Sequence, residues 1–155
     1  MKLLLCTSLL FFYYSLCIAQ NEADSLFETS KGKWPIPVSK YVEIQNNKNI
    51  LHANCNSADS ALRITTDSSY NVIAVHDGQT SRTYEADDEY ILIIKFGDYT
   101  IIYTGIEKPI TQNNSPIKSG QVISRIRKDI DNQYQLRLSL FYKDRQLNVE
   151  EWINW

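Results

Sequence analysis

Short runs of β-branched and aromatic residues follow one another along most of the chain, and no stretch repeats its apolar residues with helical spacing. The clearest runs are Tyr41–Ile44, Ala61–Ile64, Asn71–Val75, Tyr90–Lys95, Tyr99–Tyr103, Gln121–Ser124 and Tyr134–Tyr142. Between them stand residues that favour turns, for example Asp77-Gly78 and Gly97-Asp98. Short strands joined by tight turns predict an all-β fold, an antiparallel β-sandwich or folded-over barrel.

The last long run shows the strongest alternation. Its leucines, Leu136, Leu138 and Leu140, fall on one face because side chains alternate along a strand with a period of two. Gln135, Arg137 and Ser139 fall on the other face. We therefore expect the leucines to face the core and the polar residues to face water or a groove.

Residues 1–19 are typical of a secretory signal peptide. Lys2 precedes an apolar run, and Cys17 and Ala19 place small residues before a predicted cut after Ala19. We expect export to a periplasm or out of the cell. A retained anchor is disfavoured, because the run is shorter than the roughly 20 residues that a spanning helix needs. Lipid attachment at Cys17 is a further alternative, against which the bulky residues before it argue.

After the leader we expect a polar arm over residues 20–33 and one domain over residues 34–155. Pro35 and Pro37 exclude a helix where the domain begins and allow an extended edge or entry strand. Loss of the leader leaves Cys55 as the single cysteine, so no internal disulfide can form. A small buried hydrophobic side chain is the expected role of Cys55.

The charge balance excludes a general electrostatic partner. The chain has 16 Lys and Arg residues against 18 Asp and Glu residues, a formal net charge of −2, which gives no reason to expect nucleic acid or an anionic membrane as the partner.

No Gly-x-Ser-x-Gly motif and no glycine-rich phosphate loop occurs in the sequence. Adjacent acids such as Glu150 and Glu151 are interpreted as solvated charges, because neighbours on a strand point to opposite faces.

Five segments carry a resemblance to a known family. They are Trp34–Pro37, Val72–Gly78, Ile93–Tyr103, Ile117–Ile123 and Gln135–Leu140, the last running on to Trp152 and Ile153. In order and spacing they resemble the lysostaphin-type (LytM-like) zinc metalloendopeptidases over about residues 32–153. The resemblance implies a small antiparallel β-sandwich related to the duplicated hybrid motif. It also implies descent from enzymes that cut peptidoglycan cross-links with one zinc ion.

The resemblance further implies that the zinc site is lost. The family uses a His-x-x-x-Asp motif, a His after the Tyr-Ala of a central strand and a His-x-His on the last long strand. Counted from the matched segments, these positions fall on Asp59, Arg63, Gly105, Gln135 and Arg137. A catalytic zinc needs three protein ligands and an open position for water. We therefore expect no metal and no other cofactor at these positions.

The replacements also oppose a shifted metal site. Arg63 and Arg137 each bring a permanent cation, and a unit charge 4 Å from another costs roughly 4 kcal/mol at an effective dielectric of 20, about twice that for a divalent ion. His52 and His76 are expected in turns or at the surface. An active zinc peptidase that recruits one of them remains the alternative.

The function implied by the resemblance is binding without cleavage. The chain is expected to be a secreted, catalytically inactive domain that regulates a peptidoglycan hydrolase such as an amidase, or that binds a peptidoglycan stem peptide. Arg63 and Arg137 suit a carboxylate, because a guanidinium offers planar paired donors. An internal ion pair of Asp59 with one of these arginines is the alternative role. An accessory subunit of an envelope assembly is a third class.

Overall fold

The computed structural model describes residues 22–46, 60–86 and 89–155. The predicted leader over residues 1–19, and with it Cys17, lies outside the described residues, as do His52, Cys55 and Asp59. Among the described residues, no helix is long and apolar enough to cross a membrane.

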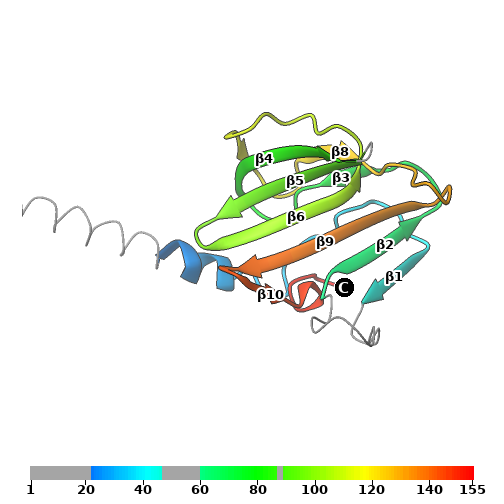
Figure 1. Cartoon of the computed structure of the whole chain (residues 1–155). Helices are drawn as coiled ribbons and strands as arrows, with labels where there is room; N and C mark the ends of the chain where they lie inside the picture. The colour runs from blue at the N-terminus through cyan, green and yellow to red at the C-terminus, as the bar shows by residue number, and fades with distance from the viewer. Residues whose placement is uncertain (1–21, 47–59, 87–88) are drawn as a thin grey trace, which may run out of the picture.

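A large antiparallel sheet dominates the fold and follows the order β1-β2-β9-β6-β5-β4-β7, with β10 paired to β9. Figure 1 looks onto one face of it. Its strands are β1 (Glu43–Asn46), β2 (Leu62–Thr66), β4 (Gly78–Ala86), β5 (Glu89–Phe96), β6 (Tyr99–Ile106), β7 (Pro116–Ile117), β9 (Tyr134–Tyr142) and β10 (Arg145–Leu147). A second, two-stranded sheet pairs β3 (Asn71–Ile73) with β8 (Val122–Arg125). The all-β antiparallel prediction is confirmed.

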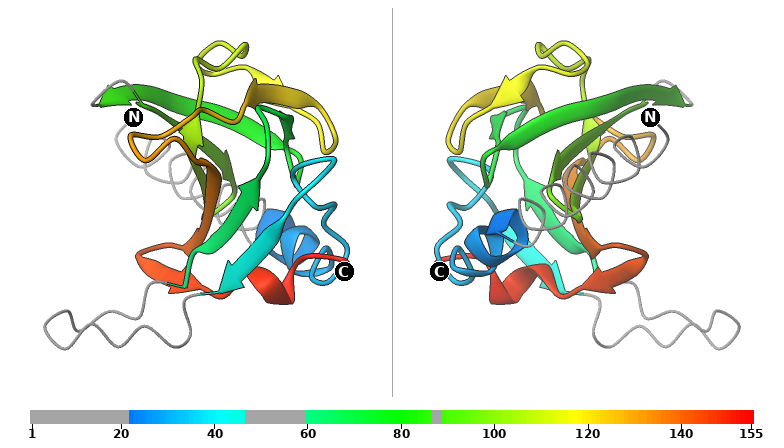
Figure 2. Two further views of the ribbon diagram at one scale, coloured as in Figure 1. Left: turned by 90° about the vertical axis from the view of Figure 1, so that its right-hand side faces the viewer. Right: turned by 90° about the vertical axis from the view of Figure 1, so that its left-hand side faces the viewer.

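The core lies on the face of the large sheet that is turned away from the viewer in Figure 1. Alternate residues of its central strands are fully buried there, among them Leu62, Ile64, Leu92, Ile94, Ile101, Tyr103, Leu136, Leu138 and Leu140. The strands β3 and β8, the N-terminal segment and the short 3-10 helix η2 (Val149–Glu151) cover this face, and the side views show the large sheet curving around them (Figure 2). The predicted alternation of β9 is confirmed.

The N-terminal segment packs into the core through one side chain. Residues 22–28 are helical, which the sequence did not indicate. Phe27 is fully buried and stacks on Tyr99 with ring centroids 3.9 Å apart. The carboxylate of Asp24 accepts a hydrogen bond of 2.9 Å from the N–H of Asp98, in the turn between β5 and β6. The described part of the predicted polar arm is therefore packed against the domain.

The two ends of the domain meet at Trp34. Its N–H donates to the carbonyl of Trp152 at 2.8 Å, and its carbonyl accepts from the N–H of Asn154 at 2.9 Å. The following segment is extended, as the prolines predict: Val38 bridges Val72, and the carbonyl of Pro37 accepts from the N–H of Ile73. A proline can serve at this position because only its carbonyl is needed.

Phe27 tests how firmly the N-terminal helix is attached. We expect Phe27→Ala to lower the free energy of unfolding by about 3–5 kcal/mol, because the change leaves a cavity among aromatic rings. Leu26→Ala on the same helix is the matched control, since Leu26 is 64% exposed. Urea denaturation measures both. Equal stability of the two variants would contradict a docked Phe27.

Candidate functional site

Two arginines stand side by side on the outward face of the large sheet. In the pairing of β2 with β9, Arg63 lies directly opposite Arg137. The neighbouring pair, Leu62 and Leu138, is buried in the core. Because alternate residues point to opposite faces, both arginines lie on the face turned away from the core. The structure thus brings together two residues that are 74 positions apart in sequence.

This pair belongs to a row of hydrogen-bond donors that crosses four strands. On one side Gln45 of β1 lies opposite Arg63. On the other side Thr104 of β6 lies opposite Arg137. We call these four residues the donor row. Arg137 is partly buried, and no hydrogen bond or ion pair joins its guanidinium group to another side chain or backbone group of the residues that the structure describes.

A pocket of about 350 Å³ lies beside Arg145 and Trp152 and contains none of the predicted site residues. Three of those residues line a second pocket. This second pocket has a volume of about 220 Å³ and is lined by Glu89, Thr104, Gly105, Asp129, Gln135 and Arg137. Three of the five predicted positions therefore share one hollow, and Arg63 stands beside it. Asp59 lies outside the described residues. We call this hollow the arginine pocket.

Glu89 and Asp129 were not predicted as members of the site. Glu89 Oε1 accepts from the N–H of Gly105 at 2.7 Å. Asp129 Oδ1 accepts from the N–H groups of Asp131 and Gln133 at 2.9 and 2.8 Å, which shapes the turn before β9. The second carboxylate oxygen of each is left for another donor. The two acids meet because the start of β5 and the turn before β9 both lie near Gly105 in the folded chain, and the sequence carries no signal of it.

Gly105, where the resemblance places a histidine, has a backbone role. Leu92 of β5 pairs with Tyr103 of β6, and Tyr90 pairs with Ile106. Two residues lie between the paired positions on β6 but one on β5, so β6 has a β-bulge at this point. Gly105 has φ +75°, and a Cβ placed on it would lie 2.0 Å from the carbonyl oxygen of Gln135. A side chain here requires the backbones of β6 and β9 to separate.

An apolar patch adjoins the donor row. Ile93 of β5 lies opposite Ile102 of β6, and Ile91 is two residues before Ile93 on the same face. All three are partly exposed, and none belongs to the core cluster. We call them the isoleucine patch. Since Ile102 precedes Thr104 by two residues, this patch is next to the donor row on the open face of the sheet.

His76 lies on the core side of the molecule, away from the donor row. Its ring centroid is 4.4 Å from that of Phe27, 5.0 Å from that of Phe96 and 5.9 Å from that of Trp34. Nδ1 is 2.7 Å from the carbonyl oxygen of Asp77, so Nδ1 carries the proton of the neutral ring. His76 lies in a bend of the chain before β4, as predicted, but the prediction did not include the packing of its ring against aromatic side chains.

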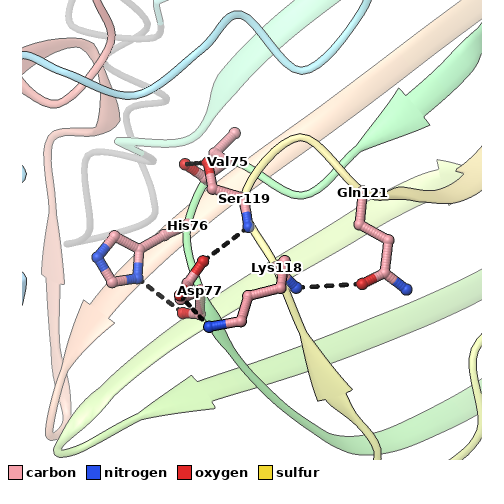
Figure 3. Close-up of polar contacts among 6 residues, drawn as sticks. All are labelled: Val75, His76, Asp77, Lys118, Ser119 and Gln121. Carbon is pink, nitrogen blue, oxygen red and sulfur yellow. Dashed lines mark hydrogen bonds and ion pairs between the residues drawn. The ribbon is translucent and has the colours of Figure 1, made fainter.

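Asp77 ties the start of β4 to the turn after β7 (Figure 3). Its carboxylate accepts from Lys118 Nζ at 2.8 Å and from the N–H of Ser119 at 2.8 Å. The hydrogen bond from Lys118 is the main cause that lowers the pKa of Asp77. Ser119 Oγ in turn donates to the carbonyl of Val75. These contacts give Asp77 a structural role.

Among the described residues, no group of three His, Cys, Asp or Glu side chains is arranged to hold a metal ion.

The bulge at Gly105 leads to a matched pair of substitutions. Gly105 and Gly120 have similar backbone angles, φ +75° and +80°, but a Cβ on Gly120 would meet nothing within 4 Å. We expect Gly120→Ala to cost about 1–2 kcal/mol of unfolding free energy, the price of a left-handed alanine. Gly105→Ala should cost clearly more because of the collision with Gln135. Urea denaturation measures the unfolding free energy of both variants. If both lose the same amount, the backbone of β9 moves away from residue 105 at no measurable cost.

The packing of His76 predicts a dependence of stability on pH. Burial lowers the pKa of His76 in the folded state, so between that value and the unfolded value of about 6.5 the unfolded chain binds the proton more readily. Stability should be full above pH 6.5 and decline as the pH falls through this interval. We expect His76→Phe to remove this decline, as measured by urea denaturation between pH 7.5 and 5. A decline of unchanged size in the variant would assign it to other groups.

Comparisons with known proteins show the fold. No family model matches the sequence, and no curated protein matches it either. Helicobacter pylori Csd3 superimposes with a TM-score of 0.64 at 16% identity, over 77% of this chain and 34% of that one, so this chain spans about a third of Csd3. A chain of the SpoIIIAH and SpoIIQ complex superimposes with a TM-score of 0.63 at 14% identity, over 76% of this chain and 98% of that one.

Two further structures are peptidases. A zinc-containing peptidase from Vibrio cholerae gives a TM-score of 0.58 at 18% identity, over 72% of this chain and 37% of that one. The M23 metalloprotease pseudoalterin gives 0.59 at 12% identity, over 78% of both chains. At these identities the similarity concerns the fold alone. The chain has an all-β fold of the LytM-like peptidase type, as its five matched segments led us to expect.

Proposed function

We propose that this chain is an exported, catalytically inactive LytM-like domain that binds a cell-envelope partner on the outward face of its large sheet. The proposed partner is a peptidoglycan hydrolase, such as an amidase that the domain regulates, or a peptidoglycan stem peptide. One observation carries the proposal. Arg63 and Arg137 face each other at positions where the resemblance expects zinc ligands.

The electrostatics of this pair support binding over metal catalysis. A zinc ion next to Arg63 and Arg137 would meet two permanent positive charges, each repelling it by several kcal/mol at a separation of about 4 Å. Gln135 and Gly105 supply neither imidazole nor carboxylate. His76, the described histidine that could replace a ligand, lies on the core side with its ring among Phe27, Trp34 and Phe96.

The surface around the arginines supports a macromolecular partner. The isoleucine patch exposes apolar side chains beside a polar donor row, the composition expected at the centre and rim of a binding interface. The fold is also compatible with such a role in other proteins. One of the superimposed chains comes from a complex of two proteins, SpoIIIAH and SpoIIQ, described as pore forming.

The proposal is tested by capture and by zinc analysis together. The full chain, purified after export, is used to capture proteins and muropeptides from an envelope extract of its own organism. We expect an amidase or a muropeptide in the bound fraction, no stoichiometric zinc, and no release of fragments from peptidoglycan. We expect Ile93→Arg to abolish capture, because it places a charged side chain in the middle of the isoleucine patch.

Ile110→Arg is the matched control, since Ile110 is 70% exposed outside the large sheet. It should leave capture unchanged. Stoichiometric zinc together with peptidoglycan cleavage would establish the alternative, an active peptidase. Capture that survives Ile93→Arg would remove the outward face from the proposal.

A further inference from the structure

Most of strand β4 forms an open edge of the large sheet (Figure 1). On one side β4 pairs with β5 along nearly its whole length. On the other side β7 pairs only with its first two residues, and the chain just before β7 bonds to Thr80. Among residues 22–46, 60–86 and 89–155, no backbone hydrogen bond joins Ser81–Ala86 to any segment except β5. An edge of this kind is a template for pairing with another strand.

The backbone groups of Thr83 and Glu85 point out of this edge. Thr80 directs its N–H and carbonyl away from β5, because both bond to the chain before β7. In an antiparallel ladder, opposed residues exchange both hydrogen bonds or neither, and the two kinds of pair alternate. Ile94, opposite Thr80, therefore bonds towards β6, as does Leu92 two residues away. Thr83 lies opposite Leu92, so its N–H and carbonyl point to the open edge, and those of Glu85 follow by alternation.

The outward side chains of β4 extend the isoleucine patch to this edge. Arg82 lies opposite Ile93, and Tyr84 lies opposite Ile91. Arg82 Nη1 donates to the hydroxyl of Tyr84 at 3.2 Å. Tyr84 is 43% exposed, large for an aromatic side chain that stands beside an apolar patch. The edge thus offers unused backbone groups and an exposed aromatic ring together, two features of an interaction surface.

We propose that two copies of this chain associate through β4, which pairs antiparallel with β4 of the second copy about a two-fold axis at Tyr84. The axis is perpendicular to the sheet, so every residue keeps its face and the pairing is centred on a single residue. Thr83 of each copy then lies opposite Glu85 of the other and exchanges both backbone hydrogen bonds with it. The two Tyr84 side chains face each other at the close spacing of a non-hydrogen-bonded pair, where aromatic pairs stabilise a sheet.

The sequence of this edge selects that register and makes the edge complementary to itself. Pairing centred on Arg82 or on Glu85 would set like charges directly opposite each other, which destabilises a sheet. Pairing centred on Thr83 would place Glu85 opposite Ser81, where the β-bulge of β4 interrupts the ladder. Pairing centred on Tyr84 avoids both problems. A second copy therefore fits this edge without any other partner.

The geometry also determines the size and strength of the assembly. Association occupies the open edge of both copies, so it stops at a dimer with an isologous interface. Since the paired stretch, Arg82–Ala86, is short, the interface is small, and we expect a dissociation constant of about 10–100 µM. The two outward faces lie on the same side, and the tyrosine pair joins the two isoleucine patches. The inference goes beyond the proposed function and does not depend on it.

The test measures the mass of the full chain after export by sedimentation equilibrium. We expect a monomer near 5 µM and mostly dimer near 500 µM, as follows from a dissociation constant of about 10–100 µM. Tyr84→Lys should keep the chain monomeric throughout, because two like charges would meet on the axis. Tyr41→Lys is the matched control and should leave the dissociation constant unchanged, since Tyr41 is 49% exposed just before β1.

A mixture of two variants locates the axis. Tyr84→Lys and Tyr84→Glu chains should each stay monomeric and should associate when mixed, because opposite charges then meet across the axis. Thr83→Pro should also abolish association. Its lost N–H points to the open edge, so the pairing of β4 with β5 keeps its hydrogen bonds. Thr83→Val keeps the N–H and should associate like the unaltered chain.

Three results would overturn the inference: a monomer at every concentration, association that survives Tyr84→Lys, and no association in the mixture of folded variants. The first result comes from the unaltered chain, so it stays decisive if a variant does not fold. Capture of an envelope partner, and its loss on Ile93→Arg, test the proposed function separately. A chain that is always monomeric could still bind such a partner.

Discussion

The antiparallel pairing of β9 with its two neighbours, β2 and β6, determines both faces of this molecule. Because residues of paired strands that lie opposite one another point to the same side, one register fixes the core and the open face together. The row that buries Leu62 beside Leu138 also sets Arg63 beside Arg137 one residue further along. A shift by a single residue would exchange the two faces. The burial of the leucines therefore stabilises the very register that holds two like charges together.

Closure of the fold at the other end depends on aromatic packing. Phe27 contacts Tyr99, Trp34, Trp152 and His76 within one cluster, which joins the N-terminal helix, the entry strand and the C-terminal turn to the large sheet. These contacts lie on the core side of the large sheet. Among residues 22–46, 60–86 and 89–155, the segments that pack on the large sheet therefore lie on its core side.

The sequence predicted structural features that follow from a repeating residue pattern, such as the inward face of a strand. It did not predict features that depend on a single contact in the folded chain. Alternation predicted the inward leucines of β9, and the matched segments placed Arg63 and Arg137 near one another. Phe27 gave no pattern, because one buried aromatic residue in a polar segment has no periodicity. The bulge at Gly105 was interpreted as a lost side chain, since the sign of φ cannot be inferred from a glycine. Asp129 joins the pocket through a turn whose position only the folded chain defines.

The proposed binding role would account for two arginines at positions where the resemblance places zinc-site residues. In a zinc peptidase the metal supplies positive charge that attracts oxygen atoms of the substrate, and it also lowers the pKa of a bound water. Guanidinium groups at Arg63 and Arg137 provide the first property without the second, because they neither coordinate water nor release a proton near neutral pH. Under the proposed function, the domain would attract a negatively charged group of its partner without activating a water for hydrolysis. Glu89 and Asp129 line the same pocket as Arg137 and place negative charge beside its guanidinium group.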